Sequence, residues 1–162
     1  MIQKKICMLG GFGVGKTSLV SRFVHSIFSD KYLTTVGVKI EKKSLQLPNQ
    51  QVDLIVWDLH GEDEFQKLRM SYLRGSAGYL LVVDATRRST LDTALRLHAT
   101  AQSVIGRVPV MLAVNKSDLE STWDLDQNTI DQLGCVVVKT SAKTGSHVEE
   151  TFLALARAMI EG

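Results

Sequence analysis

Short apolar runs recur along this chain, and longer segments with helical periodicity lie between them. The runs of strand length are Lys5–Leu9, Val52–Trp57, Tyr79–Val83, Val110–Val114 and Cys135–Val138. They are apolar on both faces, which is typical of parallel strands covered by helices on both sides. A further run, Val38–Leu47, alternates polar and apolar residues and turns back at Pro48-Asn49, which predicts an antiparallel hairpin with Val52–Trp57.

Helices are predicted between these strands, where apolar residues recur at helical spacing. The expected ranges are Lys16–Ser26, Glu64–Leu73, Thr90–Ile105, about Asp124–Leu133, and Ser146–Ile160. Strands that alternate with helices predict an α/β fold, here a doubly wound, six-stranded, mostly parallel sheet with one antiparallel strand. Such sheets bind ligands beyond the carboxyl ends of their strands. We expect residues 1–162 to form a single domain.

Composition adds constraints on partners and location. A net charge of +2 is too small to indicate nucleic-acid binding, and we expect Lys42-Lys43 and Arg87-Arg88 to be solvated surface. No apolar run is long enough to span a bilayer, and no signal peptide opens the chain. Cys7 and Cys135 lie in apolar runs and are expected to be buried free thiols. We therefore expect a cytoplasmic monomer without an intrinsic membrane anchor.

The segment Gly10–Thr17 fits the pattern G-x-x-x-x-G-K-[S/T] of a phosphate-binding loop. It follows an apolar run and opens into a predicted helix, which is the context that this motif requires. Glycines let the backbone direct its N–H groups inward, forming an anion site at the helix N-terminus. Lys16 can reach the β- and γ-phosphates, and the Thr17 hydroxyl can coordinate Mg²⁺. The expected phosphate-binding residues are Gly13, Val14, Gly15, Lys16, Thr17 and Ser18.

Asp58 begins a second motif, Asp58-Leu59-His60-Gly61, at the end of the run Val52–Trp57. An aspartate at this strand end is where P-loop proteins hold the water shell of Mg²⁺. Gly61 can give its N–H to a γ-phosphate with no side chain in the way. The spacing predicts a metal and γ-phosphate site.

Two loops at the ends of later strands indicate the base. Asn115-Lys116-Ser117-Asp118 follows Val110–Val114, and the Asp118 carboxylate can accept both the N1–H and the 2-amino hydrogens of guanine. Adenine offers neither pattern, so this loop favours GTP and GDP over adenine nucleotides. Lys116 can lie along the base plane and Asn115 can tie loops together. The second base loop is Ser141-Ala142-Lys143, where a backbone N–H can bond the guanine O6.

Taken together, these motifs resemble the Ras-like small GTPases, and the Rab branch most closely. The resemblance extends to Tyr72-Leu73-Arg74-Gly75, Val82-Val83-Asp84 and Thr140–Gly145. It implies the P-loop GTPase (G domain) fold, with GTP or GDP and Mg²⁺ as ligands.

Further residue roles come from this resemblance alone. Phe28 would cross edge-on against the guanine, Tyr32 would fold over the phosphates, and Thr35 would coordinate Mg²⁺ when a γ-phosphate is present. The switch regions would be Asp30–Val38 and Gly61–Ser71, through which protein effectors and regulators would bind.

Three departures from the family pattern concern catalysis and shape. Glu62 occupies the catalytic position where relatives usually carry Gln, whose amide orients the attacking water. Phe12 replaces a small residue near the point where an arginine finger would enter. Only Glu120–Thr140 separates the two base loops, so the helix there should be curtailed.

The chain ends at Glu161-Gly162 without the terminal cysteines of prenylated relatives. The protein could be naturally tail-less, as bacterial Ras-like proteins can be, or a domain of a longer chain; both alternatives stay open.

The resulting hypothesis is a guanine-nucleotide switch that hydrolyses GTP slowly. Its catalytic residues would be Lys16, Thr35, Gly61 and Glu62, and its metal ligands Thr17, Thr35 and Asp58. The alternative is a nucleotide-binding interaction module with little or no hydrolysis. A small-molecule kinase is disfavoured because it would not need the Asn-Lys-x-Asp loop. His98, on the apolar stripe of its helix, is expected to be a packed core histidine.

Overall fold

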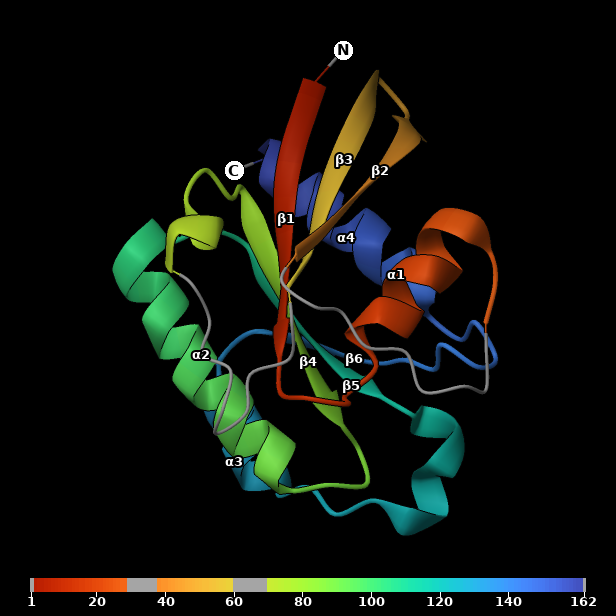
Figure 1. The fold of residues 1–162 in the computed structure, drawn as a ribbon, viewed down its shortest axis with the longest axis vertical. Helices are drawn as coiled ribbons and strands as arrows, with labels where there is room; N and C mark the ends of the chain where they lie inside the picture. Colours follow the sequence, from red (N-terminus) through yellow and green to blue (C-terminus); the bar gives the residue numbers. More distant parts are fainter. Residues whose placement is uncertain (1, 29–37, 60–69, 162) are drawn as a thin grey trace.

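A six-stranded sheet forms the centre of the molecule (Figure 1). The computed structural model describes residues 2–28, 38–59 and 70–161. The strands are β1 (Ile2–Gly10), β2 (Val38–Leu47), β3 (Gln50–Leu59), β4 (Gly78–Asp84), β5 (Val110–Asn115) and β6 (Val136–Lys139). Their order is β2-β3-β1-β4-β5-β6, and every neighbouring pair is parallel except the antiparallel pair β2/β3. The predicted α/β fold and the β2/β3 hairpin are confirmed.

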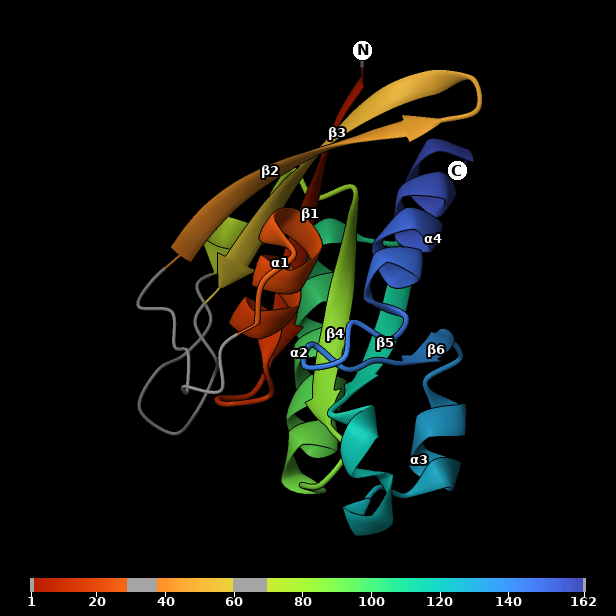
Figure 2. The same cartoon turned by 90° about the vertical axis from the view of Figure 1, so that its right-hand side faces the viewer.

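Helices cover both faces of this sheet (Figures 1 and 2). The α-helices are α1 (Lys16–His25), α2 (Ser89–Ile105), α3 (Gln127–Gln132) and α4 (Val148–Glu161), and the 3₁₀ helices are η1 (Met70–Leu73) and η2 (Ser117–Thr122). On β1, Ile6 and Met8 pack into the cluster under α1 and α4. The alternating residues Cys7 and Leu9 pack into the second cluster, under α2 and α3. A strand buried on both faces must be apolar at every position, which explains the unbroken apolar runs.

Two predicted helices differ from the structure in their described residues. The helix expected over Glu64–Leu73 lies largely outside the described residues, and its last four residues form the 3₁₀ helix η1. The last helix begins at Val148 rather than Ser146. The expected curtailment before β6 is confirmed, because α3 has only six residues and begins after Asp126, whose carboxylate accepts the Asn128 N–H at 3.1 Å.

Strand β6 corrects the expectation of burial on both faces. It lies at one edge of the sheet, and Val136 and Val137 are 62% and 40% exposed. Among the described strands, β6 pairs with β5 alone. Cys135 precedes the strand and is half-buried, whereas Cys7 is fully buried; both are free thiols, as predicted.

The ends of the described chain lie at one end of the molecule. Ile2 opens β1 and Glu161 closes α4, and both lie opposite the end where the parallel strands finish (Figures 1 and 2). No helix among residues 2–28, 38–59 and 70–161 is long and apolar enough to cross a membrane.

Candidate functional site

The loop between β1 and α1 has the backbone of an anion site. Gly13 and Gly15 adopt left-handed conformations, with φ of 77° and 99°. Gly15 is the N-cap of α1 and has no side chain to cap the helix, and the first helical turn carries no acidic residue. The first N–H groups of an α-helix have no partner within the helix. The start of α1 therefore offers N–H donors and the positive end of the helix dipole to an anion.

Gly15 and Gly10 permit close contacts that a larger residue would block. A Cβ at Gly15 would collide with the Asn115 side-chain amide, and one at Gly10 would lie 2.6 Å from the Val82 carbonyl oxygen. The loop is thus held directly against the ends of β4 and β5. This close fit explains the glycines more specifically than general flexibility does.

Lys16 lies under the loop and is 5% exposed. Its Nζ donates to the carbonyl oxygens of Gly10 and Gly11 at 3.4 and 3.3 Å. Burial lowers the pKa of Lys16 to about 8, against the opposing effect of the Asp58 carboxylate. Long bonds to neutral carbonyls compensate a buried ammonium poorly, so a phosphate oxygen would be a stronger partner.

The two predicted metal ligands that the structure describes lie together. Asp58, near the end of β3, is fully buried, and the Thr17 hydroxyl donates to its Oδ2 at 2.7 Å. A hydroxyl and a carboxylate are hard oxygen donors of the kind that Mg²⁺ prefers. The residues present therefore fit this ion.

The two base loops are joined to each other and to the phosphate loop. Asn115 donates from Nδ2 to the Val14 carbonyl at 2.9 Å, and its Oδ1 accepts the Thr140 hydroxyl at 3.3 Å. The buried Ser141 hydroxyl donates to Asp118 Oδ1 at 2.8 Å. Asp118 is itself exposed, so a buried partner orients a carboxylate that faces solvent. Ala142 is buried and Lys143 is exposed.

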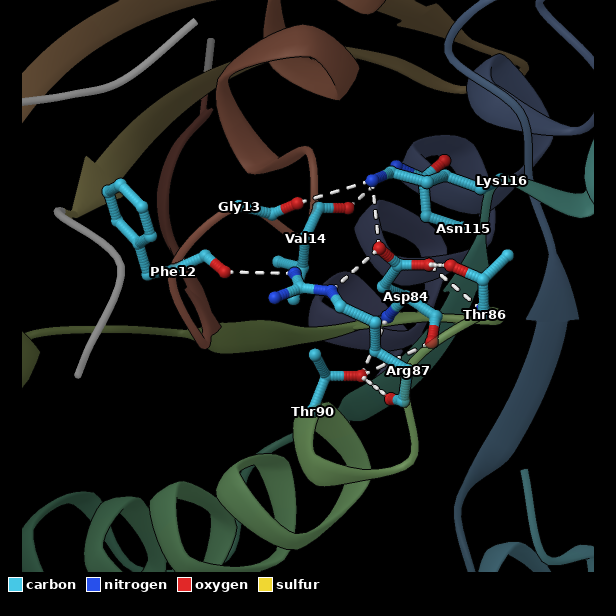
Figure 3. A network of polar contacts seen from close by, with 9 residues as sticks. All are labelled: Phe12, Gly13, Val14, Asp84, Thr86, Arg87, Thr90, Asn115 and Lys116. Carbon is cyan, nitrogen blue, oxygen red and sulfur yellow. Dashed lines mark hydrogen bonds and ion pairs between the residues drawn. The ribbon is translucent and has the colours of Figure 1, made fainter. Parts of the chain in front are cut away.

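Sequence reasoning missed one residue of this site, Asp84, which ends β4 and is 1% exposed (Figure 3). Its carboxylate accepts Lys116 Nζ at 2.8 Å and Arg87 Nε at 3.0 Å. Thr86 adds its N–H at 2.9 Å and its hydroxyl at 2.7 Å. Burial alone would raise the pKa of Asp84, but the hydrogen bonds from these three residues outweigh it and hold the pKa below its usual value. A signal for Asp84 was present in the sequence: it is a polar residue at the end of a predicted strand, on the edge of the sheet that carries the phosphate loop.

Arg87 corrects the expectation of a solvated Arg87-Arg88 pair. Its Nη2 donates to the Phe12 carbonyl oxygen at 2.9 Å, which ties the start of α2 to the phosphate loop (Figure 3). Arg88 remains surface: it reaches Asp124 at 3.7 Å, and both side chains are at least 60% exposed. Lys42 is exposed as expected, although it pairs with the buried Asp53 at 3.3 Å.

Four predicted residues, Tyr32, Thr35, Gly61 and Glu62, lie outside the described residues. Phe28 is described, three residues after α1, and is 36% exposed.

The structure brings together the phosphate-loop residues, Asp58 and both base loops at the carboxyl edge of the sheet.

A glycine loop between a buried strand and a helix that opens with Lys-Thr defines a P-loop nucleotide-binding protein. The Ras family model matches residues 5–161, and the chain belongs to this family. Ras-family proteins are GTP-binding small GTPases, so the resemblance seen in the motifs is confirmed at the level of the superfamily. The Rab-like branch stays a prediction.

Proposed function

We propose that this chain is a guanine-nucleotide switch that hydrolyses GTP slowly with Mg²⁺, with residues 1–162 forming one G domain. One observation carries the proposal: the phosphate loop, the Thr17–Asp58 pair and the two base loops meet at one edge of the sheet. The phosphate loop and the first base loop meet through Val14 and Asn115, which are 101 residues apart in the sequence, so a chance meeting of these residue types is a poor explanation.

The phosphates would lie at the start of α1. The backbone N–H groups of residues 13–18 would surround them, and Lys16 would exchange its two carbonyl partners for β- and γ-phosphate oxygens. Because Lys16 is already buried beneath the loop, little rearrangement would be needed.

The base would be read by Asp118, with Lys116 along its plane and an N–H of the Ser141-Ala142-Lys143 loop on O6. The Ser141 hydroxyl supports this assignment because it orients the carboxylate. Phe28 would cross edge-on against the guanine. A site built on such paired hydrogen bonds rejects a base that leaves them unmade.

Thr17, Thr35 and Asp58 would hold Mg²⁺, with Asp58 acting through the water shell of the ion. When bound, the ion neutralises charge on the phosphate oxygens. Tyr32 would close over the phosphates from the first switch region.

Hydrolysis would depend on positioning and electrostatics. Lys16 would stabilise charge on the transferring phosphoryl group, while Thr35 and Gly61 would contact it. Glu62 can accept a proton from the attacking water, but its carboxylate repels the γ-phosphate. This repulsion is about 3 to 4 kcal/mol for each pair of unit charges about 4–5 Å apart at an effective dielectric constant near 20. A slow intrinsic rate follows.

Single-turnover GTP hydrolysis by the wild type, Glu62→Gln and Phe12→Gly tests this mechanism. Glu62→Gln should hydrolyse about tenfold faster or more, because part of the repulsion is removed. Phe12→Gly should leave the intrinsic rate near that of the wild type, because its bulk opposes only an arginine supplied by an activator. A wild type as fast as Glu62→Gln would show that the charge argument is wrong.

The second candidate is a nucleotide-binding interaction module without hydrolysis, favoured by Glu62 and Phe12. The same experiment separates the two. Tight GTP binding, with hydrolysis no faster than that of free GTP in all three proteins, would select the interaction module.

Partners would bind next to the switch regions. Ile40 on β2 is 52% exposed and lies opposite Trp57 on β3, whose ring is 6.1 Å from that of Tyr72. These three side chains adjoin Val38 and η1, where the proposed switches end. An apolar surface beside nucleotide-sensitive loops suits effectors and regulators that distinguish GTP from GDP.

A further inference from the structure

Three consecutive carbonyl groups of the phosphate loop accept hydrogen bonds from side chains at the ends of β4 and β5 (Figure 3). Arg87 Nη2 donates to the Phe12 carbonyl at 2.9 Å, and Lys116 Nζ to the Gly13 carbonyl at 3.4 Å. Asn115 Nδ2 donates to the Val14 carbonyl at 2.9 Å. Each anchor comes from the loop that ends β4 or β5.

Anchoring these oxygens also orients the amides that follow them. A peptide unit is planar and trans, so its C=O and N–H point in opposite directions. The carbonyl of residue 12 shares its peptide with the N–H of Gly13, and the next two carbonyls pair in the same way with residues 14 and 15. Groups that hold the carbonyls toward β4 and β5 therefore turn three N–H groups toward the proposed phosphate position.

Two of the three anchors share one carboxylate oxygen. Asp84 Oδ2 accepts Arg87 Nε at 3.0 Å and Lys116 Nζ at 2.8 Å. Asp84 is 1% exposed, whereas Arg87 and Lys116 are 43% and 37% exposed. One buried carboxylate thus fixes the positions of two partly exposed cations.

The carboxylate itself is held firmly. Its Oδ1 accepts both the N–H and the hydroxyl of Thr86. The buried Thr90 hydroxyl accepts the Asp84 N–H at 3.0 Å and lies 2.7 Å from the Arg87 carbonyl, to which it donates. The turn that carries Asp84 and Arg87 is therefore fixed at the start of α2.

We propose that Asp84 and Arg87 form a strap that orients the phosphate-loop amides and slows release of the guanine nucleotide. This proposal rests on the proposed function, because it assumes that a guanine nucleotide occupies the loop. Arg87 is a positioning residue, since it acts through the Phe12–Gly13 peptide, whereas Asp84 acts on both the phosphate side and the base side of the site.

Release of a fluorescent GDP analogue, displaced by excess GDP, tests the strap. Arg87→Ala should raise the dissociation rate about 5- to 30-fold, as expected for loss of a charge-assisted hydrogen bond at a partly exposed site. Arg88→Ala is the matched control and should stay within about twofold of the wild type, because the exposed Arg88 side chain pairs with an exposed aspartate, Asp124. Arg87→Lys should have a dissociation rate between those of the wild type and Arg87→Ala, since an ammonium can reach either the Asp84 carboxylate or the Phe12 carbonyl but not both.

A comparison of ligands distinguishes positioning from general loosening of the fold. Competition against the fluorescent analogue gives the affinities of GDP and GMP. Arg87→Ala should weaken GDP several-fold more than GMP, which lacks the β-phosphate. Asp84→Asn should weaken both, because Lys116 loses its partner as well. Arg87→Ala should also reduce the affinity for GDP by a smaller factor in the Asp84→Asn background than in the wild type.

Each outcome decides the proposal. Equal dissociation rates for Arg87→Ala and Arg88→Ala would overturn it, as would equal losses for GDP and GMP in Arg87→Ala. If Arg87→Ala does not fold, the dissociation rate of the GDP analogue from Arg87→Lys decides instead. A dissociation rate from Arg87→Lys equal to that from the wild type would overturn the strap. A wild type that binds no GDP analogue would refute the proposed function itself.

Discussion

At the scale of single residues, the site consists of polar side chains with assigned partners. Ser141 is the clearest case: its hydroxyl donates to Asp118 and accepts the Thr144 N–H at 3.2 Å. One carboxylate oxygen of Asp118, Oδ1, therefore accepts a fixed hydrogen bond, while the side chain as a whole is exposed to solvent. Buried polar groups that are fully bonded specify one geometry, and the base-reading role proposed for Asp118 requires such a fixed geometry.

Asp118→Asn should reverse the base preference. The amide would oppose the guanine N1–H with its own N–H groups, whereas xanthine offers a carbonyl oxygen at position 2. GDP affinity should fall about 100-fold or more, and xanthosine diphosphate should then bind better than GDP. Asp126→Asn is a matched control at a helix N-cap, where Asn serves as well as Asp. An unchanged preference for guanine would remove Asp118 from the site.

His98 should make stability depend on pH. Its Nδ1 lies 2.8 Å from the Tyr79 hydroxyl, and burial lowers the pKa of His98 below its usual value. The folded state therefore favours the neutral ring. As pH falls through the unfolded-state pKa near about 6.5, the unfolded chain binds the proton first and stability is lost. The free energy of unfolding, measured by denaturant titration at several pH values between 5 and 8, should depend less on pH in His98→Gln than in the wild type. An identical pH dependence in the two proteins would contradict this role.

Motif spacing was sufficient to predict which described residues the fold brings together at one edge of the sheet, because their order along the chain follows the strand ends. Arg87 could not be predicted in this way. Arg87 and Arg88 are equivalent in the sequence, and only the path of the chain into α2 directs one toward Phe12 and the other toward solvent. Such a difference arises from tertiary placement, which a local pattern does not contain.

At the scale of elements, the start of α1 depends on the left-handed conformation of Gly15. Gly15→Ala would meet both backbone strain and a collision with Asn115. Nucleotide binding should fall more than about 100-fold, because the loop must move away from the base loop. The control is Gly134→Ala, with φ of 69° and open space around it, which should cost only about 1 to 2 kcal/mol of stability. Equal effects on nucleotide affinity would show that strain alone matters.

Strand β6 shows where sequence patterns stop being informative about elements. Its apolar run resembles that of β5, yet Val137 is 40% exposed and the paired Leu112 is fully buried. An apolar run predicts a strand, but strand order decides whether the strand lies at the centre or at an edge. That order depends on the whole topology.

At the scale of the whole molecule, two cores hold the helices on the sheet. Phe23 of α1 and Phe152 of α4 stack with ring centroids 4.0 Å apart in the first of these cores. Phe152→Ala should reduce the free energy of unfolding by about 3 to 5 kcal/mol, measured by denaturant titration. Val136→Ala, at a 62% exposed position, should change it by less than about 0.5 kcal/mol. A smaller loss at Phe152 would mean that the core collapses around the cavity.

Switching should be visible across the molecule by hydrogen exchange. If the resemblance to small GTPases extends to the switches, amides in Asp30–Val38 and Gly61–Ser71 should exchange more slowly with a non-hydrolysable GTP analogue than with GDP. The core strand β4, buried along its length, is the internal control and should exchange equally in both states. Equal exchange in the two switch regions would contradict a switch function.

The positions of Ile2 and Glu161, the ends of the described chain, affect how the protein can be handled. Ile2 and Glu161 both lie opposite the edge that carries the phosphate and base loops (Figures 1 and 2). A linker fused at either end would therefore anchor the molecule to a glass surface with that edge facing the solution. Individual nucleotide arrivals and departures could then be timed on single immobilised molecules, without the surface obstructing the site.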